Sequence, residues 1–394
     1  MGKGKVFDSE TSVFYDSISG VKLIKLTSYY AHNFHLYFTN EGFYNNGNNL
    51  LIGSDRENKT NLFSVDLPTG QITQLTDFKV GEQVNIQNTF LNPLKNEAYF
   101  MHDRQLFSLN LDDLKEKSLF QLPEGYIFSG SSCTADGKSV LFGLREDLSS
   151  TIASDLTNGY LGFAELEAAR PHSQICKLSL DTKEVTVIHE ENRWIGHVNA
   201  SPTKPSLLTF CHEGPWNKVD HRMWVMDMEK GEVWKLREGK SNQYAGHEYW
   251  HADGITVGYH GFTDDVKNTE GKFLGSIKYD NTELEEYEFP YQNMHIFSND
   301  TELIVGDGQQ SSAYGNVDQD SLFLWKKKNN QLEGPRILCK HRGSFQSQKL
   351  HVHPRLTTDG TKVVFTSDMS GYGHVYIAEI PDFETLPKVN DQKV

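Results

Sequence analysis

Short apolar strands and polar turns alternate along the chain, and one unit of this pattern recurs from end to end. In each unit, a strand of alternating apolar and polar residues is followed by a tight turn and usually by another short strand. These alternating strands fall at residues 61–67, 105–111, 174–180, 222–228, 275–280, 321–326 and 374–380. A period of two predicts β-strands, and the turn after each one predicts an antiparallel hairpin.

A more continuously apolar strand precedes each of these hairpins. The apolar strands fall at residues 49–54, 97–101, 139–144, 206–211, 255–259, 302–306 and 362–367. Polar turns stand in front of several of them, at residues 134–137, 201–204, 251–254 and 357–360. Asp and Gly in these turns favour a tight connection, so we expect an innermost strand just before each turn.

About seven such units predict an all-β fold, a seven-bladed β-propeller with four-stranded antiparallel blades, as a single domain over residues 1–394. A large β-sandwich explains short strands but does not explain seven matched units. One longer gap between strands, residues 147–170, contains a helix-like stretch at 161–169. We therefore predict a surface insertion at residues 147–170.

Histidines recur at nearly the same depth in the predicted innermost strands. His197, His247 and His353 each lie four residues before the turn that follows, and His295 lies three residues before Ser298. Because the first strand of each blade lines a propeller's central channel, we expect these imidazoles near one axis. A single histidine is more often structural, but four at matched depth favour a functional site.

A pair of histidines suggests a metal site. His351 and His353 are two residues apart, and in a strand such residues project from one face. Two imidazoles on one face, joined by a third from a neighbouring blade, predict a site for a divalent cation. His32 and His35, near the start of the first blade, are further candidates for the same region.

Three segments resemble a known enzyme family. They are residues 351–354 (HVHP) with Gln348 upstream, residues 246–251 (GHEYWH), and residues 212–216 (HEGPW) with Arg222 downstream. They are similar to segments of oligogalacturonate lyase, a bacterial seven-bladed propeller enzyme of polysaccharide lyase family 22. The resemblance covers nearly the whole chain, and these segments are more specific than general propeller features.

The resemblance implies a cytoplasmic lyase of pectin degradation that cleaves short fragments, chiefly digalacturonate, by β-elimination with a divalent metal, usually manganese. The metal ligands that it implies are His295, Gln348, His351 and His353, with Gln346 as a competitor for the glutamine role. Its catalytic residues fall on His247 and Arg222. The expected partner is therefore an oligogalacturonate substrate.

The chemistry of β-elimination explains why the reaction would require these residue types. The reaction removes the proton on carbon 5 of a uronate and expels the oxygen on carbon 4, and a metal on the adjacent carboxylate neutralises the developing charge. His247 is expected to be the base, with Lys218 and Arg222 left open as alternatives. His197, Trp216, Tyr249 and Trp250 are candidates for substrate binding, although the aromatic residues are equally expected in blade packing.

Composition narrows the classes of partner that we expect for the protein. The net charge is −15, from 38 basic and 53 acidic residues, which disfavours nucleic acid and anionic membranes as partners. Neutral imidazole and amide ligands would not reduce the positive charge of a bound cation. In so acidic a protein, the cation would therefore remain a site of full positive charge. The four cysteines form no CxxC pair, the start of the chain lacks an apolar signal segment, and no apolar run reaches membrane-spanning length. We therefore expect a cytoplasmic protein.

The main alternative is a non-catalytic propeller that binds other proteins, of the WD-repeat or TolB-like kind. That alternative predicts a featureless channel and leaves the matched histidines unexplained. A peptidase of the prolyl oligopeptidase type is disfavoured, because it requires a hydrolase domain with a GxSxG motif and the chain has neither.

Overall fold

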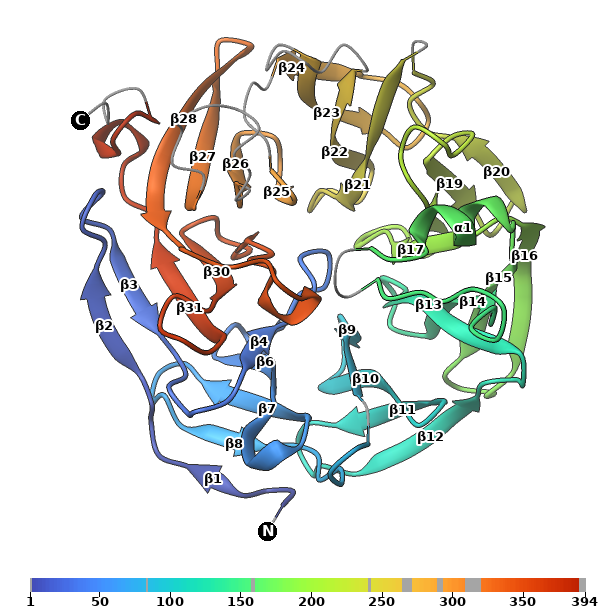
Figure 1. The fold of residues 1–394 in the computed structure, drawn as a ribbon, viewed down its shortest axis with the longest axis horizontal. Coiled ribbons are helices and arrows are strands. Elements are labelled where there is room, and N and C mark those ends of the chain that lie inside the picture. Colours follow the sequence, from blue (N-terminus) through green and yellow to red (C-terminus); the bar gives the residue numbers. More distant parts are fainter. Residues whose placement is uncertain are drawn as a thin grey trace. The chain divides into compact units, whose positions relative to one another are not determined.

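The chain divides into two compact units. The structure is a computed structural model that describes residues 2–82, 84–156, 160–239, 242–263, 271–288, 293–308 and 320–389. The first unit comprises Met1–Gln87 and Pro290–Val394, and the second unit comprises Asn88–Phe289. Within the described ranges the strands form seven sheets, and the chain is a seven-bladed β-propeller (Figure 1). The fold class predicted from the repeat is confirmed.

The first unit holds three blades. The first blade contains β1 (Val6–Phe7), β4 (Asn33–His35), β5 (Phe43–Tyr44), β6 (Asn49–Ser54), η1 (Arg56–Asn58), β7 (Asn61–Asp66) and β8 (Ile72–Gln74). The sixth contains β25 (Ile296–Ser298), β26 (Leu303–Gly306), β27 (Ser321–Lys328) and β28 (Gln331–Lys340). The seventh contains β2 (Ser12–Tyr15), β3 (Lys22–Lys25), η4 (Gln348–Leu350), β29 (Arg355–Leu356), β30 (Lys362–Ser367) and β31 (His374–Glu379), and η5 (Phe383–Thr385) follows it.

The two ends of the chain meet in the seventh blade. Strand β3 pairs with β31, with Leu23 opposite Ala378 and Ile24 opposite Ile377. The sheet order is β2-β3-β31-β30-β29, so this blade has five strands rather than the predicted four. The first blade is also larger, because β1 and β5 extend it to six strands. The repeat did not reveal these additions, since the N-terminal strands lie outside it.

The second unit contains the other four blades. The second blade comprises β9 (Val84–Leu91), which begins before the boundary of the unit, β10 (Glu97–His102), β11 (Gln105–Asn110) and β12 (Glu116–Gln121). The third comprises β13 (Tyr126–Cys133), β14 (Ser139–Glu146), β15 (His172–Ser179) and β16 (Val185–Asn192). The fourth comprises β17 (Ile195–Ala200), β18 (Leu207–His212), β19 (Met223–Asp227) and β20 (Glu232–Lys235). The fifth comprises β21 (Gln243–Trp250), β22 (Thr256–Thr263), β23 (Lys272–Lys278) and β24 (Glu285–Glu288).

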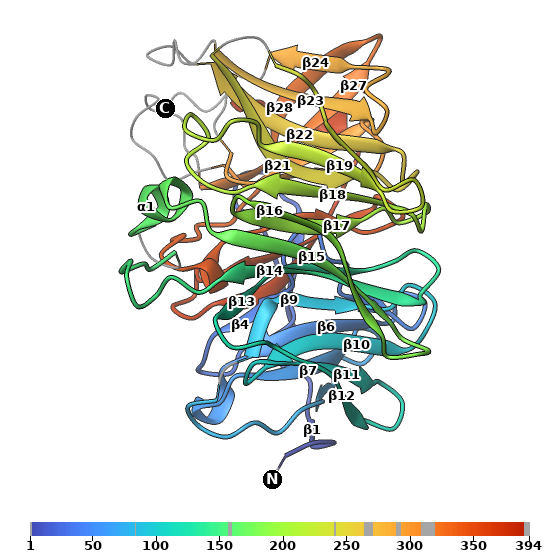
Figure 2. The same cartoon turned by 90° about the vertical axis from the view of Figure 1, so that its right-hand side faces the viewer.

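The predicted insertion contains a short helix. The segment between β14 and β15 carries α1 (Phe163–Ala168), which lies within the helix-like stretch at 161–169. Figure 2 shows the second unit from the side, with α1 projecting beyond the ends of its strands. No helix in the described ranges is long and apolar enough to cross a membrane.

Within each unit, neighbouring blades bury their faces against one another, as period-two strands require. A core cluster joins Leu141 and Ile175 of the third blade to Leu208 and Phe210 of the fourth. The first strands of these blades also bond to one another: Ser132 Oγ donates to the Val198 carbonyl at 3.0 Å and accepts from the Ala200 amide at 2.8 Å. The first strands of the third and fourth blades are therefore held side by side.

A bulge interrupts three of these first strands at corresponding positions. The register shifts between Phe128 and Ser131 in β13, between Gly196 and Asn199 in β17, and between Gly246 and Tyr249 in β21. Each bulge contains one residue with positive φ, namely Gly130 (88°), His197 (50°) and His247 (51°). Left-handed backbone is uncommon for non-glycine residues, and bulges re-aim side chains near functional sites.

Blade packing makes a direct prediction about stability. Phe142 is fully buried in the core between the second and third blades, where its ring lies 5.0 Å from Phe120 and 5.4 Å from Phe128. Phe142→Ala should lower the free energy of unfolding by about 3–5 kcal/mol, because it leaves a cavity between two sheets. Leu94→Ala, at a side chain that is 71% exposed, should change it by less than about 0.5 kcal/mol. Urea unfolding measures both, and equal losses would contradict this account of the packing.

Candidate functional site

The first unit brings three predicted histidines together. His295, His351 and His353 are all buried, and one ring nitrogen of each lies within 4.8 Å of one from each of the other two. His295 directly precedes β25, and the other two lie between η4 and β29. We refer to these three residues as the histidine cluster.

The route by which His351 and His353 converge differs from the prediction. We expected a strand with both side chains on one face, but the structure has no strand at residues 351–354. Instead, His351 ends the η4 turn with extended backbone, and His353 adopts a left-handed φ of 45°. The convergence therefore comes from an irregular backbone rather than from strand alternation.

Buried acceptors fix the orientation of the histidine cluster. Asp307 follows β26, and its Oδ2 lies 2.7 Å from His295 Nδ1, while its Oδ1 accepts the backbone amides of Met294 and His295 at 2.9 Å. A carboxylate at Nδ1 leaves Nε2 as the ring's lone-pair atom, which is the usual arrangement behind a metal ligand. Burial raises the pKa of Asp307, while the amides of His295 and Met294 oppose that rise by bonding to its ionised form.

Two further histidines donate hydrogen bonds to backbone carbonyls of His353 and Asp307, next to the histidine cluster. His35 Nε2 donates to the backbone carbonyl of His353 at 2.8 Å, and its Nδ1 lies 2.7 Å from Thr366 Oγ1. His341 Nε2 donates to the Asp307 carbonyl at 2.7 Å. His35, which we considered as a candidate for the site itself, thus has both ring nitrogens engaged with other groups. His32 accepts the amide of Gly373 at 3.0 Å through its Nδ1.

The histidine cluster has the chemistry of a metal site. Burial and the neighbouring His295 lower the pKa of His351 to about 4, so its imidazole is neutral, the form that binds metals. His351 Nδ1 is buried and has no hydrogen-bond partner within the described part of the chain. Gln348 is half-buried and begins η4, whereas its competitor Gln346 is exposed. Several imidazole nitrogens in one buried place fit a divalent cation of the transition series.

The second unit gathers the other predicted residues around His247. His247 Nδ1 lies 3.0 Å from His260 Nε2 on β22. Trp216 packs against both rings, with centroids 5.2 Å and 5.4 Å away, and the guanidinium of Arg222 lies 5.2 Å from the centroid of Trp216. The ring of His197 stacks on that of His247 with centroids 6.2 Å apart. We refer to this group as the His247 cluster.

Buried charges alternate in sign beside His247. Arg222 Nη1 lies 2.9 Å from Glu213 Oε1, and His197 lies 3.5 Å from Glu213 and from Glu248. Burial opposes ionisation of Glu213, but the charges of Arg222 and His197 outweigh it and lower its pKa to about 2. Burial likewise opposes the charge on Arg222 and His197, but the neighbouring carboxylates outweigh it and raise both pKa values. The carboxylates therefore favour the charged forms of Arg222, which is buried, and of His197, which is half-buried.

A second ionic contact anchors the loop that carries Glu213 and Trp216. His212, at the end of β18, places Nδ1 2.7 Å from Asp220 and Nε2 2.9 Å from Glu191. Burial opposes the charge on His212, but these two carboxylates outweigh it and raise its pKa. The imidazolium thus ties both ends of the loop to β16.

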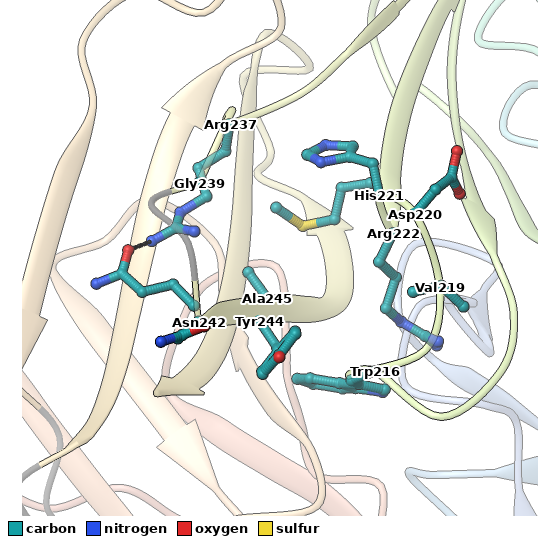
Figure 3. Close-up of a pocket in the computed structure, with 12 residues that line it drawn as sticks. Trp216, Val219, Asp220, His221, Arg222, Arg237, Gly239, Asn242, Tyr244 and Ala245 are labelled. Atoms are coloured by element: carbon teal, nitrogen blue, oxygen red, sulfur yellow. Dashed lines mark hydrogen bonds between the residues drawn. The ribbon is translucent and has the colours of Figure 1, made fainter. Parts of the chain in front are cut away.

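Close packing and a cavity complete this part of the second unit. A side chain on Gly246 would place its Cβ 2.5 Å from Arg222 Nε, so glycine is required there for the guanidinium to approach. A cavity of about 280 Å³ adjoins Trp216 and Arg222. Figure 3 shows these two side chains in its wall with Tyr244, and on the far side Arg237, which bonds to Gln243 at 2.9 Å.

Other predicted residues lie in the blade core or on the surface. Tyr249 and Trp250 are only 3% and 8% exposed, and Trp250 Nε1 donates to the Asn199 carbonyl at 2.9 Å. Their burial agrees with the packing role that the sequence left open. Lys218 is exposed in the turn before Arg222.

Sequence reasoning missed the partners of the predicted residues. Asp307, Glu213, Glu248 and His260 were not singled out, because a lone carboxylate or histidine has no distinctive spacing. A usable signal existed for His260: counting across the turn at 251–254, from Trp250 opposite Val257, places it opposite His247, and the bulge then shifts its partner to Gly246.

Comparisons with known proteins identify the family. The family model described as oligogalacturonate lyase matches residues 1–384. The oligogalacturonate lyase of Dickeya dadantii (strain 3937) is 28% identical over 401 residues, which cover 97% of this chain and 99% of that protein.

Solved structures give the same result. A structure described as oligogalacturonate lyase in complex with manganese has a TM-score of 0.86 and 26% identity, and covers 97% of this chain and 99% of that chain. The oligogalacturonate lyase of Vibrio parahaemolyticus has a TM-score of 0.85 with the same identity and coverage. Since the family model matches nearly the whole sequence, this chain belongs to the oligogalacturonate lyase family and is a lyase.

Proposed function

We propose that the protein cleaves short oligogalacturonates, chiefly digalacturonate, by β-elimination to products with an unsaturated uronate ring. The observation that carries this proposal is the convergence of three buried imidazoles in a chain of the oligogalacturonate lyase family. The reaction would serve pectin degradation.

The proposed metal ligands are His295, Gln348, His351 and His353, and the proposed ion is manganese, which a solved relative carries. When bound, manganese supplies a Lewis acid that neutralises the substrate carboxylate and the charge that develops beside it. Imidazoles and an amide are neutral ligands, so they leave the cation's charge uncompensated. In a chain of net charge −15, they would keep a locally positive place for a polyanionic substrate.

His247 is the proposed base. It takes the proton from carbon 5, the electrons of that C–H bond form the double bond to carbon 4, and the bond from carbon 4 to the leaving oxygen breaks. The leaving oxygen takes a proton from solvent. A neutral imidazole suits this role near neutral pH.

Arg222 and His197 are the proposed contacts to substrate carboxylates. The charge of Arg222 is stabilised by Glu213, and its planar fork matches a carboxylate. The raised pKa of Arg222 makes it a poor proton acceptor, which favours His247 over Arg222 as the base. Trp216, beside the cavity, is the proposed platform for a sugar ring.

We also propose a cytoplasmic location. All four cysteines are free thiols, and three of them are buried, as is usual in a reducing compartment. Fractionation of the source cells would test this location, and recovery with secreted proteins would contradict it.

The activity itself is the first prediction. The purified protein, given digalacturonate and manganese, should produce the ultraviolet absorbance of an unsaturated uronate. A chelator should abolish the signal and added manganese should restore it, because neutral ligands hold the ion reversibly. A protein that is loaded with metal but releases no unsaturated product would leave the non-catalytic scaffold as the better interpretation.

The histidine cluster makes a second prediction, about metal affinity. His353→Ala should weaken manganese binding, measured by calorimetry, by more than about 100-fold, because it removes a ligand. Asp307→Asn should weaken binding by about 10- to 100-fold, because it alters the acceptor behind His295. His172→Gln, on β15 beside Tyr126, is the control and should bind manganese normally. Unchanged affinity in His353→Ala would refute the assigned site.

The base makes a third prediction. His247→Ala should lower kcat by about 100- to 10,000-fold, the range typical for loss of a general base, while manganese affinity stays unchanged. Lys218→Ala should retain most of the activity, because the side chain is exposed. A larger loss in Lys218→Ala than in His247→Ala would reverse the assignment.

A further inference from the structure

The pairing of β21 with β22 places a second histidine directly beside His247. In the register of these strands, Gly246 lies opposite His260, so the Gly246 and His260 positions share one face of the sheet. If the strand continued regularly from Gly246, His247 would point to the other face; counted back from Tyr249, which pairs with Gly258, His247 lies on the face of His260. The bulge at His247, with its φ of 51°, joins these two registers, and the imidazole faces His260 with the two ring nitrogens 3.0 Å apart.

Only one direction of this hydrogen bond suits a base. If His260 Nε2 donated to His247 Nδ1, neutral His247 would carry its own proton on Nε2 and present no lone pair there. If His247 Nδ1 donates, Nε2 carries the lone pair and is able to take a proton. His260 then accepts through Nε2 and is itself neutral, with its proton on Nδ1.

We infer that His260 is a positioning residue for His247, accepting a hydrogen bond from His247 Nδ1 and so holding the Nε2 lone pair ready for the substrate proton. This inference rests on the proposed function. When the carbon 5 proton moves to Nε2, the C–H bond breaks and an N–H bond forms. His247 becomes an imidazolium, and its bond to His260 becomes charge-assisted and stronger. No proton passes to His260.

The surroundings of the pair favour a neutral acceptor in this position. His197 stacks on His247 from β17, Glu248 is the next residue of β21, and Glu213, Trp216 and Arg222 approach from the loop after β18. The carboxylates of Glu213 and Glu248 already have Arg222 and His197 as their basic partners. A carboxylate in place of His260 would add an unmatched negative charge where a polyanionic substrate is proposed to bind.

Trp216 strengthens the hydrogen bond between His247 and His260, because its ring covers both imidazoles. Its ring packs against both imidazoles, with centroids 5.2 Å and 5.4 Å away, and stacks on Phe262 at 5.7 Å. A hydrogen bond shielded from water by aromatic rings is electrostatically stronger than an exposed one.

Two substitutions at one position test the inference. His260→Gln places an amide oxygen near the position of Nε2 and retains an acceptor, whereas His260→Leu removes it. We expect kcat within about 5-fold of wild type for His260→Gln and about 10- to 100-fold lower for His260→Leu, with KM changed by less than about 3-fold in both. His172→Gln is the matched control on another strand of the second unit and should behave as wild type.

The pH profile gives a readout that a merely structural role would not move. Because the acceptor stabilises the protonated form of His247, its loss should make His247 a weaker base. The acid limb of kcat/KM should therefore shift to lower pH in His260→Leu and stay close to wild type in His260→Gln. Equal kcat losses in both variants, a loss in KM alone, or an unmoved acid limb in His260→Leu would each overturn the inference.

Nitrogen-15 NMR of the histidine side chains separates this inference from the proposed function. In the full-length protein loaded with diamagnetic Zn²⁺, which binds imidazole ligands, His247 should carry its proton on Nδ1, and His260→Leu should remove that preference. A wild-type signal with the proton on Nε2 would overturn the inference whatever the activity. Wild-type protein that makes no unsaturated product with manganese would refute the proposed function, while the NMR result would still decide the direction of the hydrogen bond.

Discussion

The site residues of this protein depend on a backbone conformation that their own side chains disfavour. His197, His247 and His353 all have positive φ, which costs on the order of 1–3 kcal/mol for a non-glycine residue. At His197 and His247 the strain persists because paired strand lies on both sides of each bulge. Without the bulge, alternation from the preceding residue would point His197 or His247 to the other face of its strand. The bulges allow side chains from stiff sheets to meet at one place.

The second constraint is electrostatic. An acidic chain that acts on an acidic substrate needs positive charge that its own carboxylates do not cancel. The histidine cluster meets this need with neutral donors around a proposed cation. In the His247 cluster, by contrast, Glu213 and Glu248 pair with Arg222 and His197 and favour their charged forms, and salt screens these largely buried pairs little.

Much of the fold was predictable because it repeats. Every predicted pair of strands, from residues 49–54 with 61–67 to residues 362–367 with 374–380, corresponds to a neighbouring pair in the structure, from β6 with β7 to β30 with β31. The turn chemistry at 134–137 and 251–254 also located the first strands correctly. The pairing of β3 with β31 was not predictable, because no local pattern reports contacts between the two ends of a chain.

The sequence by itself determined the fold class and the candidate histidines, since period-two alternation and turn residues act locally and recur in every blade. It also carried the family resemblance through short segments such as HVHP. Only the tertiary structure decided that Asp307 stands behind His295, that Glu213 pairs with Arg222, and that His260 faces His247. These contacts depend on bulges and on register between strands, which the order of residues in any single strand does not specify.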